Sequence, residues 1–322
     1  MLVNVLLFVV GLVMLIKGGD WFVDGASGIA RRFHLPELLI GATVVSIGTT
    51  LPEVMVSAQG AMAGSGGMAY GNAIGSIICN TSLIAALTIA IKPSKVDRKT
   101  LVIPVAFFFI AAAFYVGIAY TTGMFSRAVG FVLLAGFVVY ITYTLLEMKK
   151  APVAVEEHAE EEAGTSSMAK DIVFLVLGAI LIAFGARLLV DNGTAIAEAL
   201  GVPDTVIALT FVALGTSLPE LVTAITSLMK GHGALSLGNI IGANLFNLVL
   251  VSGVSVVISP FPVPAESTIA GMPASLVMDI PVMLAVMLIL TVPALVREKL
   301  SRVQGILLLC IYAAFCITQF VM

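Results

Sequence analysis

The chain alternates long apolar runs with short polar segments. Crossing the hydrocarbon core of a bilayer takes about 20 residues of helix, and ten runs approach or exceed that length. The expected spans are residues 2–19, 35–62, 70–91, 101–119, 125–146, 172–190, 205–229, 235–259, 274–296 and 303–321. The first run lacks the positively charged start of a signal peptide and its surroundings recur later in the chain, so we expect a retained helix. The pattern predicts an all-α integral membrane protein with ten transmembrane helices.

Composition supports this class and disfavours soluble ones. The chain is 60% hydrophobic and 11% charged, whereas soluble domains carry about 25% charged residues. Too few polar groups exist to cover a water-facing surface, which disfavours a soluble enzyme, a disordered chain or a nucleic-acid binder. The net charge of −3 indicates no bulk electrostatic partner. The three cysteines lie in apolar runs and suggest neither a disulfide framework nor a CxxC metal site.

One hydrophilic segment, residues 149–170, interrupts the pattern between spans five and six. It begins with Lys149 and Lys150 and continues with Glu156, Glu157, Glu160, Glu161 and Glu162. We interpret it as a solvated linker. A calcium-sensing acidic patch is the alternative, but like charges without a fixed geometry bind cations weakly. The segment divides the chain into a first half, residues 1–148, and a second half, residues 171–322.

Basic residues gather on one side of the expected membrane. The odd-numbered loops contain Arg31, Arg32, Lys92, Lys95, Arg98, Lys99, Lys149, Lys150, Lys170, Lys230, Arg297, Lys299 and Arg302. Only Arg127 lies in an even-numbered loop, while Lys17 and Arg187 are near span ends. Because basic loops remain in the cytoplasm, we expect cytoplasmic odd loops, a cytoplasmic linker and both termini outside.

Two segments recur at a constant offset of 167 residues. The pairs are IGATVVSIGTTLPE (40–53) with IALTFVALGTSLPE (207–220), and GNAIGSIICN (71–80) with GNIIGANLFN (238–247). Between residues 36–80 and 203–247, 17 of the 45 aligned positions are identical. The second copy starts five spans later and therefore enters the membrane from the opposite side. The repeat predicts two inverted five-helix halves, an architecture of transporters that place their site at the midplane.

Each copy carries one glutamate deep inside a span, at Glu53 and at Glu220. A carboxylate at membrane depth costs about 2.5–3.5 kcal/mol or more on insertion scales. No lysine or arginine in the core is placed to pair with both glutamates, so we expect a functional role. By contrast, we interpret Asp20, Asp24, Asp191 and Asp279 as interfacial. The paired Gly71-x-x-x-Gly75 and Gly238-x-x-x-Gly242 patterns predict helix-packing faces.

Other oxygen-bearing groups accompany the glutamates. Residues three and four apart share a helix face, so we expect one face with Thr49, Thr50, Glu53 and Ser57 and an equivalent face with Thr216, Ser217 and Glu220. Two more oxygen-bearing faces carry Ser76 with Asn80, and Asn247. Pro52 and Pro219 lack an N–H, so we expect the carbonyls of Gly48 and Gly215 to lose their helical partners. Hard oxygen ligands without His or Cys suit Ca²⁺ or Na⁺ and disfavour zinc or copper. The alternatives are that the prolines only kink helices and that individual hydroxyls bond to their own backbone.

With GTTLPE and GTSLPE each followed by a GN-x-I-G-x-x-x-x-N segment, the chain resembles the calcium/cation antiporters, and among them the prokaryotic sodium/calcium exchangers. The resemblance covers nearly the whole chain. It implies two inverted five-helix halves and four cation positions formed by spans 2, 3, 7 and 8. The implied ligands are the carboxylates of Glu53 and Glu220, the side chains of Thr49, Thr50, Thr216, Ser217, Ser76, Asn80 and Asn247, and the backbone carbonyls of Ser46 and Ala213.

Two positions depart from the family pattern. Family members often carry serine at the position of Ala243, which aligns with Ser76, so one hydroxyl ligand is missing. Some prokaryotic members have aspartate where this chain has Asn247. With asparagine also at position 80, the site has two formal negative charges. One Ca²⁺ neutralises them and three Na⁺ leave a net +1, which predicts electrogenic exchange. Losing the sodium site at Ala243 would instead give electroneutral two-for-one exchange.

The resemblance implies a secondary active antiporter that exchanges Na⁺ for Ca²⁺ by alternating access. We expect it to work as a monomer in the cell (inner) membrane, with no cofactor beyond the transported ions and no nucleic-acid partner. The runner-up is an H⁺/Ca²⁺, or other cation, antiporter on the same fold, since buried glutamates can protonate when cations leave. A passive channel is disfavoured because channels are usually oligomeric rings. No GxGD, HExxH or Ser/Lys pattern within a span indicates a membrane enzyme.

Overall fold

The computed structural model describes residues 2–150, 167–199, 215–265, 268–269 and 271–321. The helices are α1 (Leu2–Arg32), α2 (Glu37–Ile40), α3 (Ser46–Met62), α4 (Gly66–Cys79), α5 (Ala86–Ile91), α6 (Arg98–Thr121), α7 (Arg127–Lys150), α8 (Met168–Ala199), α10 (Leu218–Met229), α11 (Gly233–Phe246), α12 (Ser252–Ile258), α13 (Ile280–Arg297) and α14 (Arg302–Val321). The π-helical segments are η1 (Gly41–Val45), η2 (Asn80–Ala85), η4 (Asn247–Val251) and η5 (Ser275–Asp279).

Within the described ranges, nine helical stretches are long and apolar enough to cross a membrane. Eight of the ten predicted spans appear as such stretches close to their expected ends. The first appears as well, but α1 continues beyond residue 19 to Arg32, because its polar end is held by ion pairs and by packing on α8. The predicted span 205–229 is described only from residue 215 and contributes the twelve-residue α10. The ten-helix count therefore reaches outside the described residues, as does most of the linker.

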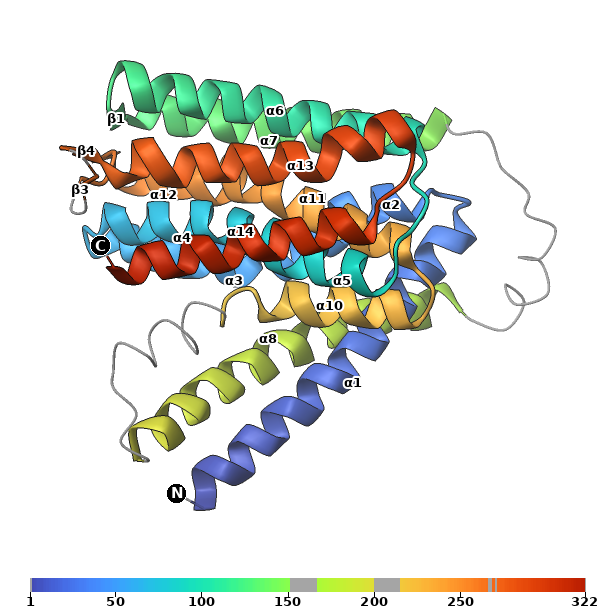
Figure 1. Ribbon diagram of the computed structural model, residues 1–322. Helices are drawn as coiled ribbons and strands as arrows, with labels where there is room; N and C mark the ends of the chain where they lie inside the picture. Colours follow the sequence, from blue (N-terminus) through green and yellow to red (C-terminus); the bar gives the residue numbers. More distant parts are fainter. Residues whose placement is uncertain (1, 151–166, 200–214, 266–267, 270, 322) are drawn as a thin grey trace.

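Helices α1 and α8 form a pair that lies at an angle to the rest of the bundle (Figure 1). Their backbones approach closely because glycines recur at seven-residue spacing, at Gly11, Gly18 and Gly25. A Cβ on Gly11 would lie 2.8 Å from the carbonyl oxygen of Gly185, and a Cβ on Gly18 would lie 2.9 Å from the amide nitrogen of Ile182. The pair is antiparallel, because the residue numbers of the contacts increase along α1 while they decrease along α8.

Helix α11 lies at the centre of the bundle and is almost completely buried. It packs on α2 and η1 with backbone against backbone. A Cβ on Gly238 would collide with Leu38, and a Cβ on Gly242 would lie 2.7 Å from the carbonyl oxygen of Ala42. The predicted packing face of the second copy is therefore confirmed. For Gly71 and Gly75, the corresponding positions in α4, no heavy atom of the described residues lies within 4 Å of the added Cβ.

Short antiparallel strands join loops of the two halves at opposite ends of the bundle. Strand β1 (Met124–Phe125) pairs with β2 (Phe261–Pro262). At the other end, a bridge joins Lys95 to Lys299, and the amide of Val96 donates to the carbonyl of Glu298 at 2.9 Å. A local hairpin of β3 (Thr268–Ile269) and β4 (Met272–Pro273) lies near β1 in Figure 1. The first two pairings join the loops that precede or follow α6, α7, α13 and α14.

Candidate cation site

Glu53 of α3 and Glu220 of α10 are completely buried. None of their four carboxyl oxygens has a hydrogen-bond partner among the described residues. No lysine or arginine of the described chain forms an ion pair with either glutamate. The helices that carry them, α3 and α10, contact each other. Uncompensated buried charge is strongly destabilising, so this arrangement calls for an external cation or for protons.

The first copy of the motif follows the prediction for a single helix face. Thr49, Thr50, Glu53 and Ser57 all lie on the buried side of α3, at the three- and four-residue spacing of a helix. The hydroxyl of Thr50 has no partner among the described residues. Pro52 lies inside the helix, where it removes the amide that would bond to the carbonyl of Gly48.

The second copy differs from the prediction. Residues 215–217 form a turn, and α10 begins at Leu218, so Thr216 and Ser217 precede the helix and do not share a helical face with Glu220. The carbonyl of Gly215 is not free, because it accepts the amide of Leu218 at 3.4 Å. Pro219 lies in the first turn of α10. Its fixed φ and missing N–H suit a helix start, so it does not kink this helix.

Asn80 and Asn247 occupy equivalent places, because each begins a π-helical segment, η2 and η4 respectively. Both side chains are fully buried, and their amide nitrogen and oxygen atoms have no partner among the described residues. Helix α3 contacts η4, and α10 contacts η2, so each glutamate-bearing helix meets the asparagine segment of the other half. π-Helical segments often occur at functional sites.

The remaining predicted ligands are placed as follows. Ser76 is buried on α4, and the hydroxyl of Ser217 has no partner among the described residues. Ser46 is buried at the start of α3, and its hydroxyl donates to the carbonyl of Gly41 at 2.7 Å. Ala213 lies outside the described residues. The unpartnered buried oxygens on Thr50, Glu53, Asn80, Ser217, Glu220 and Asn247 are the carboxylate, hydroxyl and amide types that Ca²⁺ accepts.

Two asparagines in the motif were not predicted as functional. The hydroxyl of Thr49 donates to Oδ1 of Asn239 at 3.1 Å, and the hydroxyl of Thr216 donates to Oδ1 of Asn72 at 3.4 Å. The signal was present in the sequence, because Asn72 and Asn239 are identical residues at equivalent positions of the repeat. Unpartnered buried hydroxyls on Thr223, Ser227 and Ser236 were also missed.

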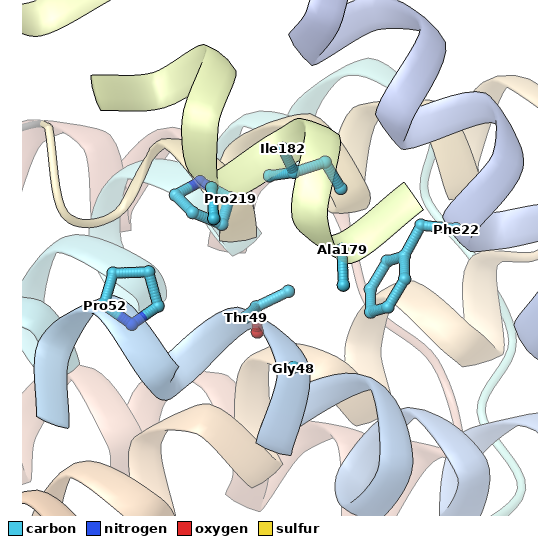
Figure 2. A pocket seen from close by; sticks show the side chains of 8 residues that line it. Phe22, Gly48, Thr49, Pro52, Ala179, Ile182 and Pro219 are labelled. Atoms are coloured by element: carbon cyan, nitrogen blue, oxygen red, sulfur yellow. The ribbon is translucent and has the colours of Figure 1, made fainter. Parts of the chain in front are cut away.

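A small hollow lies where the α1–α8 pair meets the motif. Figure 2 shows Thr49 and Pro52 on α3, with Pro219 opposite and Phe22 and Ala179 on the α1–α8 side. Among the residues that line this hollow, Thr49 has a polar side chain and the others are apolar. The α1–α8 pair thus covers one side of the residues around Glu53.

Charged residues outside the site are paired across helix ends. Lys230, after α10, lies 2.8 Å from Asp24 and 3.5 Å from Asp20 on α1. Arg32 lies 3.3 Å from Asp171 of α8. Both aspartates of α1 are partly exposed, in keeping with the interfacial interpretation, although they lie within the helix. In the described part of the chain, no group of three or more His, Cys, Asp and Glu residues gathers around a metal site.

A family model matches most of the chain. It is described as sodium/calcium exchanger protein and matches residues 3–146 and 170–321. The sodium/calcium exchanger MaX1 of Methanosarcina acetivorans is 33% identical over 354 aligned residues, which cover 99% of each chain. The inner membrane protein YrbG of Escherichia coli is 35% identical over 81% of each chain.

Solved structures agree with these matches. The sodium-calcium exchanger NCX_Mj, soaked with 2.5 mM Na⁺ and 10 mM Sr²⁺, superposes with a TM-score of 0.81 at 35% identity, covering 97% of each chain. These exchangers are transporters and not enzymes. The chain is a multi-pass membrane protein and belongs to the sodium/calcium exchanger family.

Proposed function

We propose that this protein exchanges Na⁺ for Ca²⁺ across the membrane by alternating access. Membership of the family makes it a cation/Ca²⁺ antiporter. The choice of Na⁺ as the coupling ion rests on the chemistry of the site, because the buried face offers many neutral oxygens beside two carboxylates. Na⁺ needs several oxygen ligands, whereas a proton needs only one.

The observation that carries the proposal is the pair of buried, unpartnered carboxylates at Glu53 and Glu220. Together they supply two negative charges, and no lysine or arginine of the described residues forms an ion pair with either of them. One Ca²⁺ matches that charge. The carboxylates lie in inverted copies of one motif, which favours a single site at the midplane between the two halves.

The proposed cation ligands are those of the two motif copies. They are the side chains of Glu53, Glu220, Thr49, Thr50, Thr216, Ser217, Ser76, Asn80 and Asn247, with the backbone carbonyls of Ser46 and Ala213. In this proposal the two glutamates are shared between the Ca²⁺ position and the Na⁺ positions. The neutral oxygens complete the coordination of each ion.

The proposed stoichiometry is three Na⁺ for one Ca²⁺. The two glutamates give the site a charge of −2, so the calcium-loaded site is neutral and the site with three sodium ions carries +1. The exchange cycle then moves one net charge. Ala243 argues for the electroneutral alternative, because it lacks the hydroxyl that Ser76 provides in the other copy.

The proposed arrangement in the membrane has two inverted five-helix halves, residues 1–148 and 171–322. The basic loops, with the linker 149–170, face the cytoplasm and both termini face outward. The relative YrbG is an inner membrane protein by name, which supports the cell membrane as the location. The whole repeat lies within one chain, so we propose a monomer as the working unit.

An H⁺/Ca²⁺ antiporter is the second candidate. The observation in its favour is that neither carboxylate has a partner among the described residues. Such groups can take up protons when no cation is bound. Vesicles loaded with Na⁺ at equal pH on both sides, compared with vesicles under a pH gradient without Na⁺, separate the two functions. The sodium proposal fails if only the pH gradient drives Ca²⁺ uptake.

Glu53→Gln and Glu220→Gln test the site directly in proteoliposomes. Each variant keeps the shape of the side chain and removes its charge. Hydrogen bonds and contacts to charged groups are worth about 1.5–3 kcal/mol, so we expect sodium-driven Ca²⁺ uptake to fall by roughly 10- to 100-fold. Glu298→Gln, at an exposed carboxylate after α13, is the matched control and should retain uptake. Near-normal uptake in either motif variant would refute the proposed site.

A further inference from the structure

Two hydrogen bonds cross between the halves of the motif in a symmetrical way. Thr49 of the first copy donates to Asn239 of the second at 3.1 Å. Thr216 of the second copy donates to Asn72 of the first at 3.4 Å. The two threonines are equivalent positions of the repeat, and so are the two asparagines. The same contact is therefore built twice, each time from the threonine of one half to the asparagine of the other.

The direction of these bonds matters for cation binding. A hydroxyl has one proton and two lone pairs, and an amide oxygen can only accept. A hydroxyl that donates its proton to an amide oxygen therefore keeps its lone pairs for another partner. A cation can only be bound by those lone pairs, and a proton pointing toward the cation would repel it.

We propose that Asn72 and Asn239 are positioning residues that hold the hydroxyls of Thr216 and Thr49 with their lone pairs toward the transported cation. This inference rests on the proposed function, because it needs the threonines to be cation ligands. The asparagines act through the threonines. Groups that orient metal ligands in this way typically contribute about 10- to 100-fold to metal affinity.

The orientation of Asn72 is fixed by its own amide nitrogen. Nδ2 of Asn72 donates to the backbone carbonyl of Glu53 at 3.1 Å and to the hydroxyl of Ser57 at 2.7 Å. A flipped amide would place its oxygen against the Glu53 carbonyl, which cannot donate. Oδ1 is therefore directed to Thr216. The same residue thus supports the backbone at one glutamate and a hydroxyl of the other half.

Asn239 is held by its backbone. Its carbonyl oxygen lies 3.0 Å from the hydroxyl of Ser46, whose one proton it shares with the carbonyl oxygen of Gly41, and the preceding Gly238 lies directly against Leu38. Its Nδ2 is buried and has no partner among the described residues. The two asparagines therefore perform one task with different support, and Asn239 has a donor available for a further oxygen.

Double-mutant cycles provide a test with an internal control. The matched pairs are Thr49→Val with Asn239→Leu, and Thr216→Val with Asn72→Leu. The crossed pairs are Thr49→Val with Asn72→Leu, and Thr216→Val with Asn239→Leu. Affinity for Ca²⁺ is measured by calorimetry on the purified full-length protein, and half-saturating Ca²⁺ and maximal rate are measured in proteoliposomes.

We expect each asparagine variant to weaken Ca²⁺ affinity by about 10-fold, with a larger effect on half-saturation than on maximal rate. In a matched pair the second substitution should add little, because the threonine hydroxyl has already lost its orientation. In a crossed pair the two effects should multiply, because they act on separate bonds. Asn239→Ala and Asn72→Ala replace the leucine variants if those do not fold.

The inference is overturned if the losses of Ca²⁺ affinity multiply in the matched pairs as they do in the crossed pairs. It is also overturned if the asparagine variants change only the maximal rate. These outcomes leave the proposed function standing as long as the unmodified protein binds Ca²⁺ and exchanges it for Na⁺. An unmodified protein that binds no Ca²⁺ would refute both.

Discussion

At the scale of single residues, the two copies of the motif differ at the aligned positions Ser76 and Ala243. Both positions are buried, with Ser76 at 5% and Ala243 at 0% exposure. The difference removes one hydroxyl oxygen from the second copy, while the pairs Glu53/Glu220, Thr49/Thr216 and Asn80/Asn247 are identical in the two copies. The site is therefore pseudo-symmetric in its charges and asymmetric in its neutral oxygens.

Ala243→Ser should strengthen sodium binding, because it restores the hydroxyl that Ser76 supplies in the first copy. A hydrogen-bond-sized contribution of about 0.5–1.5 kcal/mol corresponds to roughly 2- to 10-fold in the Na⁺ concentration that half-saturates Ca²⁺ exchange. Ser76→Ala is the matched opposite and should raise that concentration. Measuring Na⁺-dependent Ca²⁺ uptake checks both. If Ala243→Ser left sodium dependence unchanged while Ser76→Ala weakened it, position 243 would not face a sodium ion.

Much of the site follows from the sequence at this scale. The offset of the repeat identified Glu53 and Glu220 by pairing two rare intramembrane carboxylates, and burial without partners agrees with a functional role. Asn72 and Asn239 were missed because a neutral amide at a packing face, unlike an intramembrane carboxylate, carries no charge that marks it as functional. Their role depends on contacts between residues 144 and 190 positions apart, which no local pattern reveals.

At the scale of elements, the crossing of α11 over α2 and η1 shows how glycines determine helix distance. Gly238 and Gly242 allow backbone to lie on backbone, which brings Asn239 within reach of Ser46 and Thr49. The repeat predicted this face. It did not predict that α10 begins only after Ser217, because Pro219 fits the first turn of a helix as well as a kink within one.

Gly238→Ala should destabilise the protein, because the added Cβ meets the backbone of Leu38, whose carbonyl carbon lies 2.8 Å away. Overpacking of this kind costs about 1–3 kcal/mol. Gly71→Ala is the equivalent change in α4, where no described atom lies within 4 Å, and should cost much less. Thermal unfolding in detergent measures both. Equal losses would show that a further segment of the chain covers α4 at Gly71.

At the scale of the whole molecule, the strand pairings join one half to the other at both ends of the bundle. β1–β2 lies at one end and the Lys95–Lys299 bridge at the other, and residues 94–96 correspond to residues 261–263 in the repeat. Hydropathy predicted the membrane class and most spans because lipid imposes length and apolarity. It could not predict these cross-connections or the angle of α1 and α8, which depend on side-chain fit.

Reporters should show the two termini and the linker on opposite sides of the membrane. A fusion after Met322 is expected to read as external and an insertion near Gly164 as cytoplasmic, because thirteen basic residues lie in odd loops and one in an even loop. Protease accessibility or a compartment-sensitive enzyme checks this. Two reporters on one side would contradict the inverted repeat as well as the orientation.

Exchange should respond to the membrane potential. In vesicles loaded with sodium, the proposed stoichiometry would move three Na⁺ out as one Ca²⁺ enters, so that one positive charge leaves per cycle. An inside-positive potential should therefore speed Ca²⁺ uptake and an inside-negative one should slow it, with about 2.3 kcal/mol per 100 mV available. Clamping the potential with a potassium ionophore measures the effect. If neither the rate of Ca²⁺ uptake nor the final Ca²⁺ gradient changes with the imposed potential, three-for-one exchange is contradicted.

The close packing of α1 on α8 at Gly11, Gly18 and Gly25 affects when α1 can reach its final environment during synthesis. Helix α1 is synthesised before its packing partner α8, which begins at Met168. Until α8 has been synthesised, the face of α1 with Gly11, Gly18 and Gly25 has no α8 backbone to pack against. The packing of α1 can therefore be completed only after synthesis of the second half of the chain has begun.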